Sequence, residues 1–311
     1  TLVIAASNSK DKAQADYVCD GSSDQDEINS ALDALPENGG AVYLTEGTYI
    51  LSGNIIISKS NVTIVGAGAS TVLKIKDAKN ADMYVIYASG KVNLLIQNLR
   101  IDGNKANQST GMMYGIYFTS VENSKIVDCW VENLRYYGIC LYSSSNNNTV
   151  TGNTCQGNLE GIYLYPSSNN NTVTGNTCQG NGGLGIYLSG SSNNTVTGNT
   201  CQGNGGHGIY LTSNNNTVTG NTCQGNGWDG IYLEYSSNNT ISSNTCQGND
   251  YDGIYLRYSS NNMVTGNTVV GNSQSSNNNW DGILIGNESD YNNVQGNTVR
   301  RGTGGNQQRF G

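Results

Sequence analysis

Residues 145–167 read SNNNTVTGNTCQGNLEGIYLYPS, and residues 168–191 repeat this stretch closely as SNNNTVTGNTCQGNGGLGIYLSGS. The glycine before the Ile-Tyr-Leu segment recurs at 115, 138, 161, 185, 208, 230, 253 and 282. A period of about 23 residues is typical of a solenoid, in which each repeat stacks on its neighbours. Short β segments between Asn- and Gly-rich turns leave no room for a βαβ unit. The repeat therefore predicts an all-β fold, a single-stranded right-handed parallel β-helix.

We expect two short strands in each coil, Thr-Val-Thr and Gly-Ile-Tyr-Leu. Side chains alternate across a strand, so the Ile and Leu of the second segment point into the core and its Tyr points outward. The Asn of each Gly-Asn-Thr recurs in register, and stacked amides can bond to one another as an asparagine ladder. Its members are Asn153, Asn176, Asn199, Asn221, Asn244, Asn267 and Asn297.

Five of the eight cysteines follow the same period and do not suggest a disulfide framework. They are Cys155, Cys178, Cys201, Cys223 and Cys246. The equivalent positions of flanking coils hold Ile101, Val131, Val269 and Val299. Cysteine therefore replaces aliphatic residues in one column, where it acts as a small buried hydrophobic side chain. Stacked Cβ vectors run parallel and do not converge, so we expect free thiols.

Composition excludes several classes of function. Charged residues make up 12% of the chain and the net charge is −8, which argues against a nucleic-acid partner because phosphate binding needs a basic surface. No run of 18 apolar residues is present, so we expect no membrane span. The chain opens at Thr1, which suggests a processed chain, and the abundance of Asn and Tyr suits a secreted or cell-surface location.

The first hundred residues are less regular than the rest. Apolar residues at Ile28, Leu32 and Leu35 follow helical spacing within 24–35, with acidic residues in the first turn. The exposed end of a solenoid needs a cap, and this short helix is expected to supply the N-terminal one. We expect one β-helix domain over 1–311, with the cap and first coils in 1–60, regular coils in 61–300 and a C-terminal tail in 301–311.

The N-terminal features and the repeats resemble those of the pectate-lyase-like superfamily. The matching features are Asp20-Gly21, Asp24, the helix with Ile28, Ala31 and Leu32, Gly39-Gly40, Val42-Tyr43-Leu44 and Gly47-Thr48-Tyr49. The repeats are similar to the parallel β-helix repeats of that superfamily and of its NosD-like group. The resemblance implies the β-helix fold over nearly the whole chain. It leaves function open, because the superfamily includes lyases, hydrolases, epimerases, phage tailspikes and adhesins.

Departures from the repeat mark the candidate functional site. Insertions at 102–113 and 273–279 lengthen the same turn in two coils. Between them, the two residues before each recurring glycine vary, and three C-terminal coils carry an aromatic residue followed by Asp. These pairs are Trp228-Asp229, Tyr251-Asp252 and Trp280-Asp281. One coil earlier stands the only histidine, His207, and further back in the same column stands Glu160.

Stacked carboxylates about 5 Å apart could share a Ca²⁺ ion or act as a paired acid and base. The aromatic rings beside them could stack on sugars. We take Trp228, Tyr251, Trp280 and Glu160 as candidate ligand-binding residues, and Asp229, Asp252, Asp281 and His207 as candidate catalytic residues. Asp229 and Asp252 are the candidate Ca²⁺ ligands. The alternative is a turn role, in which Asp before Gly bonds to backbone N–H groups.

Catalytic motifs of the superfamily are incomplete here. Gly206-His207-Gly208 has the Gly-His-Gly form of polygalacturonases, but their Asn-Thr-Asp, Asp-Asp and Arg-Ile-Lys motifs are absent. Pectate lyases use an arginine base, and the one arginine near the acidic column, Arg257, should instead form an exposed ion pair with Glu234. The Asp-Pro-His signature of mannuronan epimerases is also absent.

The sequence thus favours an extracellular or cell-surface protein with a structural, adhesive or carbohydrate-binding role. The alternative is a polysaccharide lyase or glycoside hydrolase that acts in a groove along the β-helix, and the sequence leaves enzyme activity undecided. The expected partner is a polysaccharide or cell-surface glycan, with self-association by end-to-end or lateral stacking as a further possibility. No cofactor other than Ca²⁺ is suggested.

Overall fold

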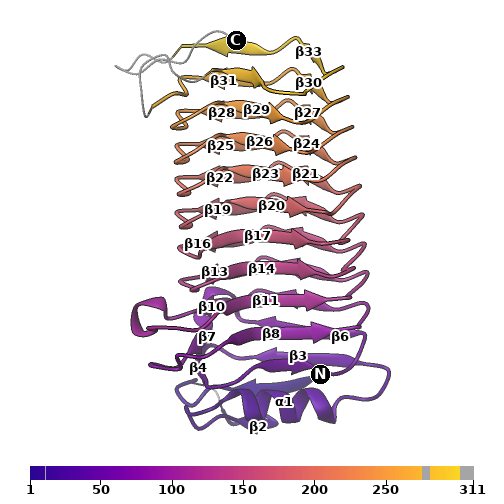
Figure 1. Ribbon diagram of the computed structural model, residues 1–311. Coiled ribbons are helices and arrows are strands. Elements are labelled where there is room, and N and C mark those ends of the chain that lie inside the picture. Colours follow the sequence, from indigo (N-terminus) through magenta and orange to yellow (C-terminus); the bar gives the residue numbers. More distant parts are fainter. Residues whose placement is uncertain (11, 275–280, 302–311) are drawn as a thin grey trace.

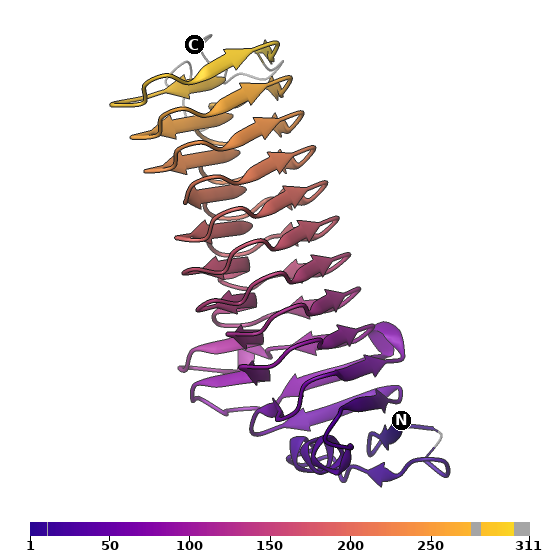
Figure 2. The same ribbon diagram turned by 90° about the vertical axis from the view of Figure 1, so that its right-hand side faces the viewer.

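The computed structural model describes residues 1–10, 12–274 and 281–301. Over these residues the chain winds into stacked coils that form three parallel sheets, a right-handed parallel β-helix (Figure 1). The view turned by 90° shows the same regular stack of coils edge-on (Figure 2). Each regular coil has three strands where the sequence predicted two, because Thr-Cys-Gln also forms a strand, separated from Thr-Val-Thr by a Gly-Asn corner.

The three sheets, here called sheets A, B and C, contain 13, 11 and 10 of the described strands. Sheet A has the order β2 (Tyr17–Val18), β1 (Leu2–Ala5), β3 (Gly40–Leu44), β6 (Val62–Gly66), β9 (Leu95–Gln97), β12 (Lys125–Val127), β15 (Thr149–Thr151), β18 (Thr172–Thr174), β21 (Thr195–Thr197), β24 (Thr217–Thr219), β27 (Thr240–Ser242), β30 (Met263–Thr265) and β33 (Asn293–Gln295). Sheet B has the order β4 (Gly47–Leu51), β7 (Thr71–Ile75), β10 (Arg100–Asp102), β13 (Trp130–Glu132), β16 (Thr154–Gln156), β19 (Thr177–Gln179), β22 (Thr200–Gln202), β25 (Thr222–Gln224), β28 (Thr245–Gln247), β31 (Thr268–Val270) and β34 (Thr298–Arg300). Sheet C has the order β5 (Ile55–Ile57), β8 (Met83–Ser89), β11 (Met113–Thr119), β14 (Tyr137–Tyr142), β17 (Glu160–Tyr165), β20 (Ile186–Ser189), β23 (Ile209–Thr212), β26 (Ile231–Glu234), β29 (Ile254–Arg257) and β32 (Ile283–Ile285).

The predicted capping helix is present as α1 (Gln25–Ala34), at the N-terminal end of the stack (Figure 1). Its Ile28, Ala31 and Leu32 are buried against the first coil. The Asp24 carboxylate accepts the backbone N–H groups of Gly21 at 2.8 Å and Ile50 at 2.7 Å, which ties the start of the helix to β4. Two short 3₁₀ helices, η1 (Gly68–Ser70) and η2 (Lys105–Asn107), lie in turns, the second within the insertion at 102–113.

The core consists of ladders of identical residues in register. Cys155 pairs with Cys178 across sheet B, Val131 precedes them and Val269 follows Cys246, which confirms that cysteine occupies an aliphatic column. All eight cysteines are buried and free of disulfides. The free, stacked thiols predicted from the sequence are therefore present.

The predicted asparagine ladder is also confirmed. Asn176 Nδ2 donates to Asn199 Oδ1 at 2.9 Å, and the Asn176 backbone N–H donates to the same oxygen at 2.9 Å. A second ladder runs at the next corner, where Asn181 Nδ2 donates to Asn204 Oδ1 at 2.9 Å. Because the buried amides of these two ladders bond from coil to coil, the ladders keep the corners aligned along the regular coils.

The recurring glycine is required by a close approach between coils. A Cβ on Gly208 would lie 2.6 Å from the carbonyl oxygen of Gly230 and 3.0 Å from Cys223 Cβ. The chain can therefore turn into sheet C at this point only if the side chain is absent. The residues just before this glycine are held at the edge between sheets B and C, where the candidate site lies.

Candidate functional site

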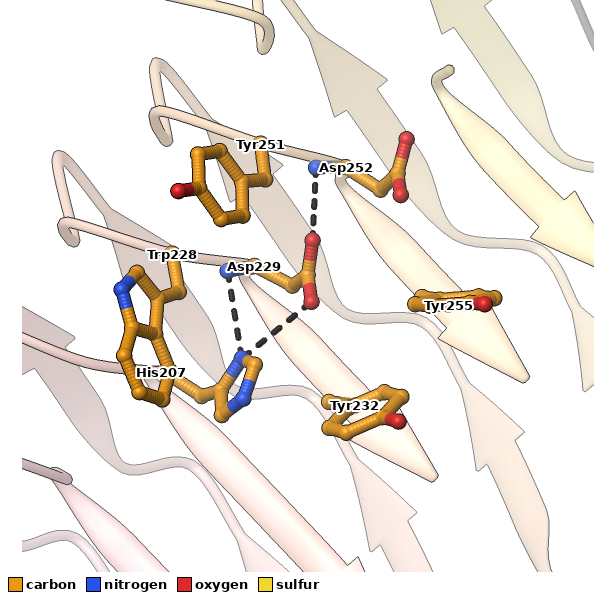
Figure 3. A pocket seen from close by; sticks show the side chains of 7 residues that line it. All are labelled: His207, Trp228, Asp229, Tyr232, Tyr251, Asp252 and Tyr255. Atoms are coloured by element: carbon orange, nitrogen blue, oxygen red, sulfur yellow. Dashed lines mark hydrogen bonds and ion pairs between the residues drawn. The ribbon is translucent and has the colours of Figure 1, made fainter. Parts of the chain in front are cut away.

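The turn from sheet B to sheet C places an aromatic residue and an aspartate at the same edge in successive coils. Trp228 and Asp229 lie in the turn between β25 and β26, and Tyr251 and Asp252 lie one coil further along (Figure 3). The strands that follow turn their outward tyrosines toward the same hollow. This hollow is a pocket of about 360 Å³. Seven residues line it: His207, Trp228, Asp229, Tyr232, Tyr251, Asp252 and Tyr255.

The two aspartates are fixed by hydrogen bonds between coils. Asp229 Oδ1 accepts the backbone N–H of Asp252 at 2.7 Å, and Asp252 Oδ1 accepts the backbone N–H of Asp281. The three residues are only 3%, 1% and 5% exposed. The turn role that we weighed as an alternative therefore accounts for one oxygen each of Asp229 and Asp252, and it holds these carboxylates rigidly at the pocket floor.

His207 is buried beside Asp229. Its Nδ1 lies 3.2 Å from the Asp229 backbone nitrogen and 3.2 Å from Asp229 Oδ2. One ring nitrogen cannot accept from the first and donate to the second at once. A ring without a proton on Nδ1 accepts the Asp229 N–H, and a ring that carries a proton on Nδ1 donates to the carboxylate. Either form contacts Asp229 and fixes its orientation. The ring also packs 4.9 Å from that of Trp228 and 4.7 Å from that of Tyr232, between their centroids.

The indole at the edge of the pocket and the rings of the outward tyrosine column differ in what they expose. Trp228 is 46% exposed at the outer edge. By contrast, Tyr187 and Tyr210 of the outward tyrosine column stack on each other with centroids 4.7 Å apart and planes within 8°, and Tyr210 stacks in the same way on Tyr232. The ring faces in the column therefore cover one another, and only the ring edges reach solvent. This arrangement packs the tyrosines against each other and leaves no ring face open to a ligand. The exposed indole is the surface on which an external ring could stack.

The ion pair predicted beside the column is present. Arg257 Nη1 lies 3.1 Å from Glu234 Oε1, and the Tyr210 hydroxyl donates to Glu234 Oε2 at 2.6 Å. Both charged side chains are partly exposed, so the pair contributes little to stability. Its role is to hold the outer ends of the tyrosines in place.

The structure brings five predicted site residues together and separates others. His207, Trp228, Asp229, Tyr251 and Asp252 line one pocket. Asp281 follows in the same column without lining it, whereas Trp280 and residues 275–279 of the second insertion lie outside the described residues.

Glu160 lies three coils before Asp229, about 14 Å away along the stack, and outside this pocket. The insertion at 102–113 lies still further away, at the coil of β11, so it does not border the pocket. The predicted groove between two insertions stays a prediction.

Two lining residues were missed from the sequence, Tyr232 and Tyr255. Each stands three residues after the aspartate of its coil, at the outward position of the next strand. The signal was available, because an outward side chain at the start of a strand lies beside the turn that leads into it. Alternation within Ile-Tyr-Leu predicts only that these tyrosines point outward from the sheet.

Two models of known protein families match this chain. The family model described as "Periplasmic copper-binding protein (NosD)" matches residues 54–216, more than half of the sequence, and a right-handed β-helix region model matches residues 160–307. The chain belongs to the NosD family. No curated protein sequence is significantly similar to this chain.

Solved structures share the fold of this NosD family member at low sequence identity. The A-module of mannuronan C-5 epimerase AlgE6 from Azotobacter vinelandii superposes with a TM-score of 0.82 and 22% identity, covering 91% of this chain and 84% of that one. The AlgE4 A-module from the same organism gives 0.81 and 21%, covering 94% of both chains. The active domain of tailspike protein 2 from bacteriophage CBA120 gives 0.65 and 16%, covering 91% and 42%. At these identities the similarity shows the fold alone.

The histidine and the one cluster of candidate ligands among the described residues do not fit a copper site. Copper sites are built from imidazole, thiolate and thioether ligands. The chain has one histidine, His207, whose Nδ1 is engaged by Asp229. Among the described residues one cluster of three His, Cys, Asp or Glu side chains occurs, Cys19, Asp24 and Glu27. Burial raises the pKa of Cys19, which keeps it a thiol, and both Asp24 oxygens accept backbone N–H groups.

A shared Ca²⁺ at Asp229 and Asp252 stays a prediction. One oxygen of each carboxylate is already bonded to the backbone of the next coil. Ca²⁺ takes six to eight oxygen ligands, so most of its coordination shell would have to come from water or a ligand.

In the described part of the chain no helix is long and apolar enough to span a membrane.

Proposed function

We propose that the chain is a carbohydrate-binding β-helix that acts outside the cytoplasm, at a cell surface or in a periplasm. The family name is that of a periplasmic protein, and the similar folds include enzymes named for mannuronan and a phage tailspike. These relatives support an extracytoplasmic glycan as the partner. The binding site in this proposal is the pocket around Trp228, Asp229 and Asp252.

One observation carries the proposal. An exposed indole stands at the mouth of a pocket whose floor holds two buried, immobilised carboxylates. Sugars offer apolar C–H faces, which stack on aromatic rings, and hydroxyl groups, which donate hydrogen bonds to carboxylates. Because Asp229 and Asp252 are already ordered in the free protein, binding loses little side-chain entropy there.

A lyase or hydrolase is the second candidate, and it is favoured by the buried contact between His207 and Asp229. General acid–base chemistry needs a group that can move a proton to the substrate. Among the described residues no lysine or arginine lines the pocket to neutralise an acidic sugar, and Asp229 Oδ1 and Asp252 Oδ1 are held by backbone N–H groups. The geometry therefore supports binding better than turnover.

The test is titration of a panel of acidic and neutral oligosaccharides, with and without Ca²⁺, by calorimetry. Trp228→Ala should weaken binding at least tenfold, which equals about 1.4 kcal/mol. Asp252→Asn, which keeps an oxygen for the Asp281 N–H, should weaken it through the lost charge. Trp130→Ala on sheet B is the matched control, because Trp130 is 39% exposed and lies outside the pocket. Loss of binding by Tyr187→Ala with normal binding by Trp228→Ala would move the site to the tyrosine column.

The enzyme alternative is tested on the same panel by assaying for new reducing ends and for the absorbance of unsaturated products. Binding without product supports the proposal. Product formation that is lost in Asp229→Asn would show that the pocket is catalytic.

A further inference from the structure

The tyrosine column of sheet C is interrupted at one position. Cys140 stands in register between Tyr117 and Tyr163, where the neighbouring coils carry tyrosine. Its side chain is 1% exposed and much smaller than a phenol ring. A pocket of about 270 Å³ opens at this gap, and its lining residues are Tyr114, Tyr117, Tyr136, Tyr137, Cys140, Tyr142, Tyr163 and Tyr165. This tyrosine cage lies four coils, about 19 Å, from the pocket at Trp228.

The tyrosine cage contains stacked ring pairs, Tyr136 with Tyr137 at 26° and Tyr117 with Tyr142 at 29°, but it also contains ring pairs at right angles, which the regular column lacks. The planes of Tyr114 and Tyr137 meet at 86°, and those of Tyr137 and Tyr163 meet at 87°. Beyond the gap, Tyr163 and Tyr187 return to a stack with an angle of 7°. Rings at right angles around one hollow form walls that face in different directions, as in a box. Such boxes are the usual receptors for quaternary ammonium groups, which are attracted to the negative faces of aromatic rings.

Glu160 adds a negative charge beside the cage. It is the first residue of β17 and pairs in register with Tyr137. Burial, and to a smaller extent a charge on Glu160, raises the pKa of Tyr137, Cys140 and Tyr163, so the carboxyl group lies near three lining residues. Glu160 Oε2 is buried, and within the described residues it has no hydrogen-bond partner.

Nothing in the described part of the chain neutralises this carboxylate. The four ion pairs there leave Glu160 out. The nearest arginine in sequence on this edge, Arg135, donates instead to the carbonyl oxygens of Gln108 and Gly111, at 3.1 and 3.4 Å. Burial alone raises the pKa of Glu160 to about 7. A cation in the cage would relieve this cost, because an opposite charge favours the ionised carboxyl.

We propose that the tyrosine cage binds a quaternary ammonium cation of the choline type, with the rings around its methyl groups and Glu160 as the counter-charge. A methylated ammonium donates no hydrogen bonds, so it suits a cavity walled by phenol rings better than a lysine-like or guanidinium group does. An added carboxylate or phosphate on the ligand would have to point away from Glu160. This site is independent of the glycan pocket and would stand if that pocket bound nothing.

Calorimetric titration with tetramethylammonium and choline tests the proposal, with 3,3-dimethylbutan-1-ol as the uncharged analogue of choline. The protein should bind choline at least tenfold more tightly than the neutral analogue, since the two differ only in charge. Phosphocholine provides a further arm, and tighter binding of it than of choline would indicate a head group attached to a larger molecule. Equal affinity for choline and the neutral analogue, or no binding of any cation, would overturn the proposal.

Two variants locate the site. Cys140→Tyr restores the residue of the neighbouring coils, fills the gap and should abolish choline binding. Glu160→Gln removes the counter-charge and should weaken binding about tenfold while leaving the cage open. Trp228→Ala, in the other pocket, should bind choline normally. Circular dichroism and thermal unfolding verify folding. Choline binding that survives in either folded cage variant would show that the cation binds elsewhere.

Discussion

Replacing Glu160 by Gln should change the pH dependence of stability in a defined direction. Burial raises the pKa of this carboxyl from 4.5 to about 7 in the folded protein. In the unfolded chain it loses its proton near its usual pKa. Between these two values the unfolded state binds fewer protons than the folded state, so the contribution of Glu160 to stability falls as the pH rises through this window.

The magnitude follows from the two pKa values. Each tenfold change in an acid dissociation constant corresponds to about 1.4 kcal/mol, so ionised Glu160 destabilises the fold by about 3 kcal/mol above pH 8 and by nothing below pH 4. Glutamine is uncharged throughout. The difference in unfolding free energy between Glu160→Gln and the parent chain should therefore increase by about 3 kcal/mol from pH 4 to pH 8, in favour of the variant.

Coils of a solenoid can unfold in stages, so the assay needs a local probe. Hydrogen exchange of the amides in β14, β17 and β20, followed at pH 5 and pH 8 with correction for intrinsic rates, reports the coils around Glu160. Glu288→Gln is the matched control, because Glu288 is exposed. A difference that is the same at both pH values, or equal in the two variants, would refute the assignment of a buried, charge-destabilised carboxyl.

Three further predictions follow from the packing. Thiol titration of the native protein should find few reactive groups and the denatured protein should show most of the eight cysteines, whereas recovery of disulfides would contradict a reduced column. The double replacement of Ile28 and Leu32 by Asp should destabilise α1 by several kcal/mol and expose the end of the core. Sedimentation experiments should then show self-association. A monomeric, equally stable variant would show that the cap lies elsewhere. In a denaturant titration, Gly208→Ala should lower the free energy of unfolding by about 1–3 kcal/mol, because its Cβ would lie 2.6 Å from the carbonyl oxygen of Gly230. Gly182→Ala is the control and should change this free energy little, because the nearest atom to its Cβ would be 3.7 Å away.

Much of the fold could be predicted because each coil repeats the same local chemistry. Alternation within Ile-Tyr-Leu identified the inward and outward columns, and the register of Cys155 with Val131 identified cysteine as a core residue. The third strand was missed because Thr-Cys-Gln is short and its Thr and Gln are polar. Its pairing arises from the coil above and below, which a single repeat does not reveal.

The candidate site was only partly predictable. The departures at Trp228 and Asp229 marked the edge at which the structure has a pocket, because they break a pattern that the rest of the chain repeats. Glu160 occupies the same column, yet three coils separate it from Asp229, and its position beside the tyrosine cage depends on ring orientations that the sequence does not encode locally. The gap at Cys140 was visible in the repeat as a tyrosine replaced by cysteine.

A glycan site at the Trp228 pocket is tested most directly by the affinity of one oligosaccharide, chosen from the panel as the tightest ligand, for the Trp228→Ala and Trp130→Ala variants. Both replacements remove a partly exposed indole from a sheet edge or face, so they are matched in the surface that they delete. The pocket proposal predicts at least a tenfold loss of affinity for Trp228→Ala and an unchanged affinity for Trp130→Ala. Unchanged affinity in both folded variants would contradict a glycan site at this pocket.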